Sequence, residues 1–423
     1  MRYINSNMNK CLITKDLTRN AVFFLFCFFS LKGVCQSGEG TVSTLVKMGF
    51  ENVGCTEDDN ERIYTIQNSA YRLQGVGIGK AVDVIQKTGL PDGKSCRIIV
   101  LDNNVPQISL FYQPTKKDSL LEASRQDWNV SYNLGDAWKQ ARKIKKENSS
   151  LFKVDIVVYP ELSLKNLVIT QVYQVLFNLS PTIEVSFWKG MSLTAQMVIP
   201  IYNDGFEMMS EAVHNVYDRV HPGCVSLSQT VRLPYNTWAT LSVGHFMANR
   251  YGVDLSARHV LKMDQRFSFE GRVGYTGACY WDGFTCHFDS RKVWTWHIGA
   301  NFFWPYYNLQ TSVKLIQHIQ GEKSIRCDMI RHFKYVSIGF YGEKANRGIR
   351  ANAGFRFQIA LPPYRYKRKG YIPRVTPSEN FGMVYNAGNE RNYYKTYRTS
   401  PSDNIMHNNS LNPYFIKSEL VNY

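Results

Sequence analysis

Apolar and polar residues alternate with a period of two through residues 152–361, and this pattern constrains the fold more than any other feature of the chain. In the segment 191–201 every second residue is apolar, and the segments 266–275 and 349–359 repeat the alternation. About twelve stretches of roughly ten residues follow it, which is the length that a tilted membrane-spanning strand needs. The pattern predicts a mainly β protein, with an antiparallel transmembrane β-barrel of about twelve strands over residues 151–361.

A soluble β-sandwich is the alternative fold, because its strands also alternate. Sandwich strands usually have about five or six residues, however, and here the apolar face is almost free of charge. The mean hydropathy of −0.30 fits a membrane barrel, since only every second residue of a strand faces lipid. Aromatic residues gather near the expected strand ends, as in the girdles of membrane barrels. They are Trp281, Trp294, Trp296, Trp304, Tyr306 and Tyr307.

The expected connections between strands alternate largely between short and long. Tight turns are predicted at 234–236, 264–265 and 305–306, and long loops at 203–222 and 276–291. Membrane barrels have tight periplasmic turns and longer outer loops. An even number of strands then leaves both chain ends in the periplasm.

Residues 1–35 have the pattern of a secretory signal peptide. Four basic residues precede the apolar stretch 21–31, and small residues stand before Gln36, so we expect cleavage after Cys35. An N-terminal anchor helix and lipidation at Cys35 are the alternatives. Loss of the leader, with its five basic residues and one acid, lowers the formal net charge from +16 to +12. An exported basic chain is expected to meet an anionic lipid surface or an acidic glycan, and not nucleic acid.

Six cysteines follow the leader. Secretion permits disulfides, and the candidate pairs are Cys55 with Cys96 and Cys279 with Cys286, although sequence does not fix the connectivity. None of the cysteines has the spacing of a metal site, so neither a metal nor a cofactor is expected.

Residues 36–150 predict a small α+β periplasmic domain with a linker. The expected elements are helices at 40–49 and 71–88, a strand at 61–67, and a hairpin of 96–101 with 107–112. Residues 134–148 have a basic amphipathic pattern, which indicates a solvated helix or linker, or else a membrane-surface anchor.

A glycine-rich stretch, Gly75-Val76-Gly77-Ile78-Gly79-Lys80, looks like a phosphate-binding loop at first sight. A P-loop needs Ser or Thr where Ala81 stands, and a dinucleotide-binding fingerprint needs Gly at Lys80. We interpret the stretch as a flexible start of a helix.

The polar face of the expected strands carries many charged residues, which would line the lumen of a barrel. Buried charges must be paired or hydrated. One interpretation is a wall of ion pairs, and the other is a cationic path for an anionic or hydroxyl-rich polymer, since arginine donates two parallel bonds to a carboxylate. The candidate path residues are Arg232, Arg258, Lys262, Arg266, Glu270, Arg272, Lys314, Arg326, Arg350 and Arg356.

Several motifs, in this order, resemble YjbH-type exopolysaccharide proteins. In the small domain these are Leu45 to Val53 and Tyr71-Arg72 with Gly79-Lys80-Ala81. In the expected barrel they are Val198 to Asn203, His221-Pro222-Gly223, Val225 to Gln229, Gly244-His245-Phe246 and Gly252-Val253-Asp254. The resemblance covers roughly residues 40–361 and implies an outer-membrane barrel that takes part in export of exopolysaccharide or capsule. It implies no catalytic residues.

Residues 362–423 follow the last expected strand. The stretch Asn352 to Ile359 resembles the last-strand signal that the barrel-assembly machinery recognises, which indicates closure near Leu361. The remaining residues are rich in Tyr, Asn, Lys and Arg, and their low apolar content predicts an extended, basic periplasmic tail. The alternative for Tyr414 to Tyr423 is a final strand or a docking peptide.

Taken together, the sequence predicts a protein of the outer membrane of a Gram-negative bacterium that is not an enzyme. The expected partners are outer-membrane lipid, an anionic polysaccharide, periplasmic export components and the barrel-assembly machinery. The alternatives are a structural or adhesive barrel without transport, and a barrel enzyme acting on lipid or glycan. An enzyme would need a nucleophile with a base, or paired carboxylates. Asp254 and Glu270 instead stand among basic residues, which indicates salt bridges.

Overall fold

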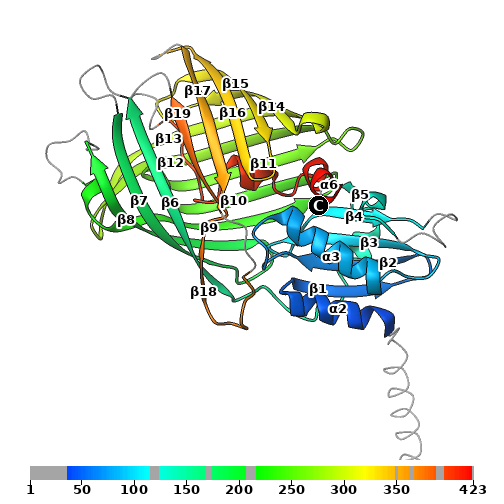
Figure 1. Cartoon of the computed structure of the whole chain (residues 1–423). Coiled ribbons are helices and arrows are strands. Elements are labelled where there is room, and N and C mark those ends of the chain that lie inside the picture. Colours follow the sequence, from blue (N-terminus) through cyan, green and yellow to red (C-terminus); the bar gives the residue numbers. More distant parts are fainter. Residues whose placement is uncertain are drawn as a thin grey trace, which may run out of the picture.

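A computed structural model describes residues 36–114, 123–166, 173–205, 216–347, 351–361, 366–386 and 395–421. These residues form a small α/β module, built from the N-terminal part of the chain, and a large curled sheet beside it (Figure 1). The leader expected at residues 1–35 lies outside the described residues.

The module is a five-stranded sheet with helices packed on it. Its elements are α2 (Gln36–Met48), β1 (Glu51–Glu57), β2 (Glu61–Gln67), α3 (Gln74–Thr88), β3 (Ser95–Asp102), β4 (Val105–Tyr112), η1 (Arg125–Asp127), β5 (Asn129–Ser131) and α4 (Ala137–Ala141). The strand order is β1-β2-β3-β4-β5, and only β2 and β3 are parallel. The crossover α3 joins these two strands, because parallel neighbours cannot be joined by a tight hairpin.

Apolar side chains from both helices and the sheet make the core of the module. Leu45 of α2, Ile85 of α3 and Ile98 of β3 are fully buried within it. The expected helices, strand and hairpin are therefore confirmed, with one correction. The basic stretch 134–148 contains only the short α4, whose Ala137 and Ala141 pack inward together with Leu134 just before it. No helix in the described part of the chain is long and apolar enough to cross a membrane.

Among the described residues the large sheet has fourteen strands, whereas about twelve were expected. Twelve of them, β6 to β17, follow one another as antiparallel neighbours, and two short strands, β18 and β19, complete the sheet. The strands are β6 (Val154–Asn166), β7 (Tyr173–Val185), β8 (Met191–Asp204), β9 (His221–Leu233), β10 (Thr237–Phe246), β11 (Arg250–Val260), β12 (Phe267–Asp282), β13 (Thr285–Trp304), β14 (Leu309–Gln317), β15 (Lys323–His332), β16 (Val336–Ala345), β17 (Ala351–Ala360), β18 (Arg374–Pro377) and β19 (Asn380–Asn386). The loop expected at 276–291 is instead the outer part of the β12–β13 hairpin, which turns at Gly283 with a φ of 58°.

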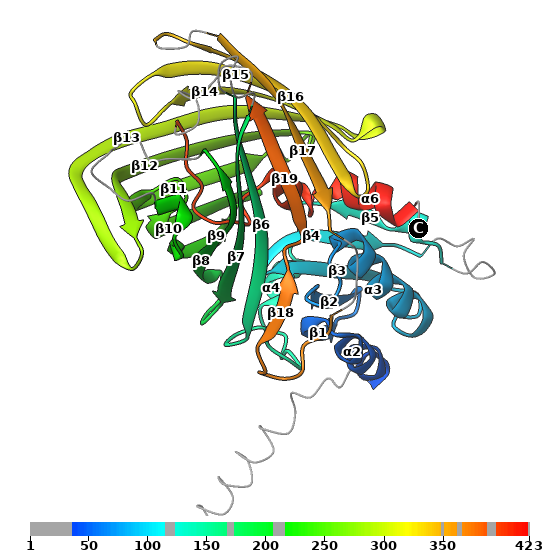
Figure 2. The same cartoon turned by 60° about the vertical axis from the view of Figure 1, so that its left-hand side comes forward.

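The sheet curls until one segment, residues 374–386, contacts both of its edges (Figure 2). The first part of this segment, β18, pairs in parallel with β6, and Ser378 donates to the Val158 carbonyl at 2.9 Å. The second part, β19, pairs antiparallel with β17. No strand pairing joins β19 to β6 among the residues described, so the ring of backbone hydrogen bonds is incomplete at this seam.

The two faces of the curled sheet differ as the alternation predicts. Large apolar side chains point outward and stay exposed, including Leu255 on β11, Ile298 on β13 and Phe340 on β16. Small polar side chains point inward and are buried, including Thr182, Ser242 and Ser312. An exposed apolar face of this extent needs an apolar environment around it.

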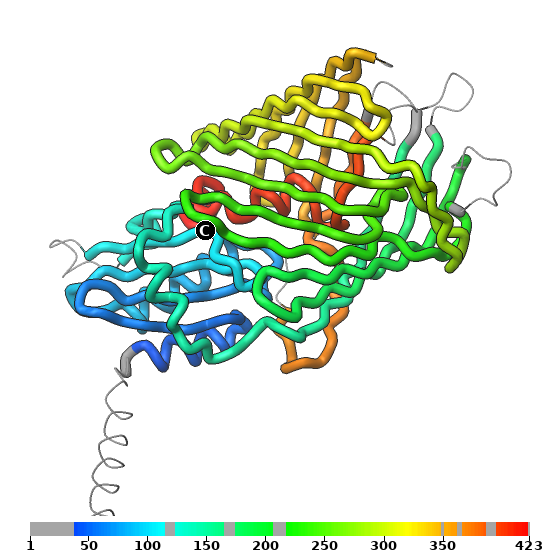
Figure 3. The backbone as a smooth tube through the Cα atoms, turned by 180° about the vertical axis from the view of Figure 1, so that it is seen from behind, coloured from blue at the N-terminus to red at the C-terminus, as the bar shows by residue number. Residues whose placement is uncertain are grey.

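The module packs against one end of the curled sheet, where the short turns lie (Figure 3). Gly190, between β7 and β8, donates to the Asn103 carbonyl at 2.9 Å. Gln265, between β11 and β12, accepts from the Tyr132 backbone N–H at 2.9 Å. The opposite end, where the β12–β13 hairpin turns, is called the distal end below.

Candidate functional site

A buried Asp–Arg–Tyr cluster lies on the inner face of the sheet. Arg272 of β12 donates to Asp254 of β11 at 2.7 Å, and the Tyr397 hydroxyl donates to the same carboxylate oxygen at 2.6 Å. The Asp254 residue is 2% exposed. The guanidinium lies over the Tyr397 ring, 4.6 Å from its centre, and that ring stacks on Phe246. A charge-assisted bond in a place that excludes water is stronger than the same bond at a surface.

Glycine at position 274 leaves the space that Tyr397 occupies. A Cβ atom built there would lie 1.7 Å from the Tyr397 hydroxyl oxygen and 2.9 Å from the hydroxyl oxygen of Thr295. Both distances are below van der Waals contact. The absence of a Cβ atom at Gly274 therefore leaves room for the Tyr397 side chain against the inner face of the sheet.

Two further clusters of charges lie on the inner face. Around Tyr341, Arg326 and Arg356 each contact Asp328 at 3.0 Å, and Arg326 lies 3.8 Å from the centre of the tyrosine ring. Glu343 accepts from His318 at 2.7 Å beside them. In the other cluster Glu270 pairs with Lys314, and His297 lies 3.6 Å from Glu270.

The residues predicted to line a polymer path lie in several different places in the structure. Glu270, Arg272, Lys314, Arg326 and Arg356 belong to the inner clusters just described. Four cations there face four carboxylates, those of Asp254, Glu270, Asp328 and Glu343. The expected excess of positive charge is therefore not found in these clusters. The physical reason is that a buried guanidinium without a counter-charge costs several kcal/mol.

The other predicted path residues lie elsewhere. Arg232 donates to the carbonyl oxygens of Pro106, Gln107 and Tyr132, so it holds the module against β9. Arg258 donates to the Tyr132 hydroxyl at 3.1 Å. Lys262 and Arg266 lie in the exposed turn after β11, where Arg266 pairs with Asp264. Arg350 lies outside the described residues.

Residues 395–421, called the C-terminal segment below, lie inside the curled sheet, and this corrects the expectation of an extended tail. Lys395 pairs with Glu322 at 2.6 Å, and both are buried. The Thr399 carbonyl accepts from Ser226 at 2.8 Å, and Met406 donates its backbone N–H to Gln358 at 2.8 Å. The low apolar content is compatible with burial here, because the wall it meets is itself polar.

The C-terminal segment ends in two helices, α5 (Ile405–Asn409) and α6 (Pro413–Val421). Helix α6 joins the sheet to the module, so of the alternatives considered for 414–423 a docking peptide fits, as a helix. Lys417 donates to the carbonyl oxygens of Gln126 and Trp128 at 2.6 Å. On the sheet side, the Tyr414 ring stacks on Phe303.

Helix α6 packs against the glycine-rich stretch at 75–80. Glu419 is buried against Gly75 at the first turn of α3, where a Cβ on residue 75 would lie 1.6 Å from the Glu419 carboxylate. The interpretation as a helix start is confirmed, since α3 begins at Gln74. The carboxylate at a helix N-terminus is favoured by the helix dipole, but burial dominates and raises the pKa of Glu419 to about 7.

Docking of α6 is expected to weaken as pH rises. The ordinary pKa of a glutamate is 4.5 and that of docked Glu419 is about 7, so the docked state binds the extra proton between these values. Docking is strongest below pH 4.5, declines through this window, and above pH 7 is weaker by about 3 kcal/mol. Hydrogen exchange of residues 413–421 measured from pH 4 to 8 tests this, and Glu419→Gln should remove the slope. An equal slope in that variant would assign the effect to another group.

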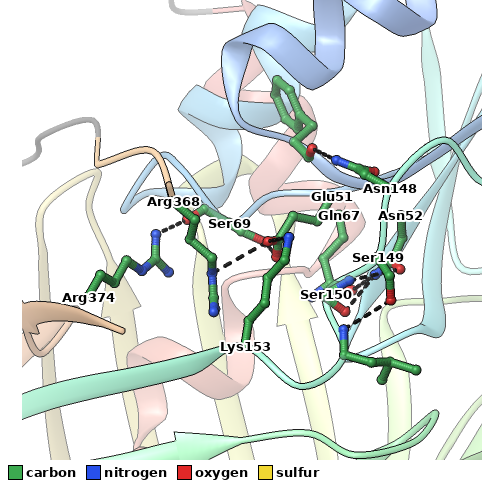
Figure 4. Close-up of polar contacts among 12 residues, drawn as sticks. Glu51, Asn52, Gln67, Ser69, Asn148, Ser149, Ser150, Lys153, Arg368 and Arg374 are labelled. Atoms are coloured by element: carbon green, nitrogen blue, oxygen red, sulfur yellow. Dashed lines mark hydrogen bonds and ion pairs between the residues drawn. The ribbon is translucent and has the colours of Figure 1, made fainter. Parts of the chain in front are cut away.

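Buried charges also connect the module, β6 and β18 (Figure 4). Glu51, which is 3% exposed, pairs with Lys153 at 2.6 Å and accepts from Ser69 at 2.6 Å. Asp155 of β6 accepts from Arg368 at 2.5 Å and from Arg374 at 2.6 Å. The module is thus fixed to the strands at the seam.

Neither expected disulfide is present, since all six described cysteines are free thiols. Cys55 lies on β1 and Cys96 on β3, with β2 between them. Two strand spacings of about 4.8 Å exceed the reach of a disulfide. Cys279 and Cys286 are diagonal neighbours, because Cys279 is opposite Phe288 and Cys286 is opposite Trp281.

Sequence reasoning missed Tyr397, Lys395 and Glu419, all of which lie in the C-terminal segment. The spacing of Ile416, Glu419 and Leu420 could have indicated a helix with a buried face there, but it was not used. Within the described residues, no group of three or more His, Cys, Asp or Glu side chains is placed to hold a metal ion.

No family model matches the sequence, and no curated protein matches it. Two solved structures match in part, both of an outer membrane protein of Vibrio cholerae. In-vitro folded OmpT is 10% identical with a TM-score of 0.27, and its loop L8 deletion mutant is 9% identical with a TM-score of 0.28. Each similarity covers 55% of this chain and 97% of the other.

Proposed function

We propose that the curled sheet is a β-barrel of the outer membrane, with the module on its periplasmic side. The observation that carries this proposal is the outward apolar face on strands of nine to twenty residues. A soluble sandwich would bury such a face against a second sheet. Here the inner face holds ion pairs and the C-terminal segment, so hydrocarbon is the environment that fits the outer face.

Heat-modifiable migration tests this assignment. Outer-membrane fractions should contain the protein, and the unboiled sample should migrate faster on a gel than the boiled one, because a folded barrel resists the detergent. A chain that is monomeric and soluble without detergent would contradict the assignment.

We further propose that this barrel takes part in export or surface assembly of an exopolysaccharide or capsule, and that its own C-terminal segment closes the interior. The resemblance to YjbH-type proteins supports the substrate class. The polar, charge-balanced wall supports a hydroxyl-rich polymer better than a strongly anionic one. Passage would require the segment to leave the wall, and the contact of α6 with the module gives periplasmic export components a way to release it.

Deletion of the gene, followed by measurement of cell-associated and released polysaccharide, tests the export role. We expect the released polymer to fall while cell-associated polymer accumulates. Unchanged amounts in both fractions would favour the second candidate, a structural or adhesive barrel without transport, which the filled interior also supports.

A further inference from the structure

A group of outward-pointing lysines and aromatic rings lies at the distal end of the sheet. We call it the distal belt, and it consists of Tyr251, Tyr275, Lys292, Trp294, Lys323 and Lys344. It lies on the outer surface of β11, β12, β13, β15 and β16, at the end opposite the module.

The strand register shows that the three lysines share the outer face. Lys323 is opposite Gln317 on β14. Gln317 lies two residues from Leu315, which is exposed. Lys344 is opposite Ile325, which is also exposed. Lys292 lies two residues from exposed Trp294 on β13. Alternate residues of a strand share a face. The three lysines therefore lie on the same outer face as these apolar residues, nearer the distal end of the sheet.

Aromatic rings position the first of these lysines. The Lys292 ammonium lies 5.6 Å from the ring centres of both Tyr251 and Tyr275. The Tyr275 ring is itself 4.7 Å from that of Trp294. The faces of two aromatic rings therefore hold the Lys292 ammonium at the distal edge of the apolar surface. Membrane barrels have their aromatic girdle at such an edge.

Within the described residues, no carboxylate pairs with these lysines. All three are exposed, and none forms an ion pair with any residue in the described ranges. This contrasts with the inner clusters, where four cations face four carboxylates. Aromatic rings beside unpaired lysines fit a ligand that has an acyl part and an anionic headgroup.

We infer that the distal belt binds the phosphate groups of a phosphorylated lipid in the outer leaflet. The acyl chains would lie along the apolar columns below the belt, while the lysines donate to the phosphate oxygens. Lys323 and Lys344 lie on adjacent strands, so one phosphate can contact both, and Lys292 is placed for a second phosphate. This inference rests on the proposed membrane barrel.

Binding of diphosphorylated lipid A to the full chain in detergent micelles, followed by native mass spectrometry, tests the inference. The variant Lys292→Gln/Lys323→Gln/Lys344→Gln should bind about a hundredfold more weakly, since each lysine near an anionic lipid contributes roughly fivefold. The Lys→Arg triple variant should retain binding. The matched control, Lys80→Gln/Lys87→Gln/Lys143→Gln, removes three exposed module lysines and should leave affinity unchanged.

Two further arms distinguish the outcomes. Dephosphorylated lipid A should bind all variants equally weakly, and millimolar inorganic phosphate should not displace the lipid. Displacement by inorganic phosphate, or equal lipid binding by the glutamine variant and its control, would overturn the inference. Heat-modifiable migration of every variant is read in parallel, because its loss would instead contradict the membrane barrel itself.

Discussion

A chain ending at residue 394 should expose Cys224 to thiol reagents and conduct ions across a bilayer. In the full chain Cys224 is fully buried, and its sulfur lies 3.3 Å from the Thr399 carbonyl oxygen of the C-terminal segment. Maleimide labelling of Cys224, read by peptide mapping, should rise more than about tenfold. Loss of covering contacts worth 1.4 kcal/mol alone shifts the equilibrium between covered and exposed Cys224 tenfold. Conductance in planar bilayers should be near zero before truncation and measurable after it.

A point substitution tests the same idea in the full chain. Gly274→Ala places a Cβ atom 1.7 Å from the Tyr397 hydroxyl oxygen, so the tyrosine must leave the wall and Cys224 labelling should rise. Gly271→Ala on the same strand is the matched control, because a Cβ there meets nothing within 4 Å. If truncation and Gly274→Ala both leave Cys224 unreactive while the proteins stay heat-modifiable, the C-terminal segment does not close the interior.

The strands of the large sheet could be predicted from the sequence because one physical requirement applies at every second residue. The side chains that face outward must be apolar, so Leu255 alternates with the polar Asp254 and Ser256 whatever its partners are. Pairing on adjacent strands follows from the same pattern. The interpretation of Asp254 and Glu270 as salt-bridge residues is confirmed by their pairs with Arg272 and Lys314.

The contents of the interior could not be predicted in this way. Tyr397 meets a carboxylate 143 residues away in sequence, and Glu419 meets a glycine at the start of a helix in another domain. No local period marks such contacts, and a segment that is buried against polar groups needs no apolar stripe. The tail therefore had the composition of a solvated segment although many of its side chains are buried.

The Asp254→Asn substitution is expected to destabilise the folded protein by about 3 to 5 kcal/mol. The carboxylate accepts from both Arg272 and Tyr397, so its loss leaves a buried guanidinium without a counter-charge. Urea unfolding in detergent micelles, followed by tryptophan fluorescence, measures this change. The double variant Asp254→Leu/Arg272→Leu should recover most of the stability, because removal of both charges leaves no unpaired one.

Asp264→Asn is the matched control for this prediction. Asp264 also pairs with an arginine, Arg266, at 2.7 Å, but that pair lies in an exposed turn where water screens the charges. Its loss should leave the unfolding midpoint unchanged. If the two single variants are equally stable, the interior around Tyr397 is hydrated, and the segment that carries this tyrosine cannot be what excludes water from the wall.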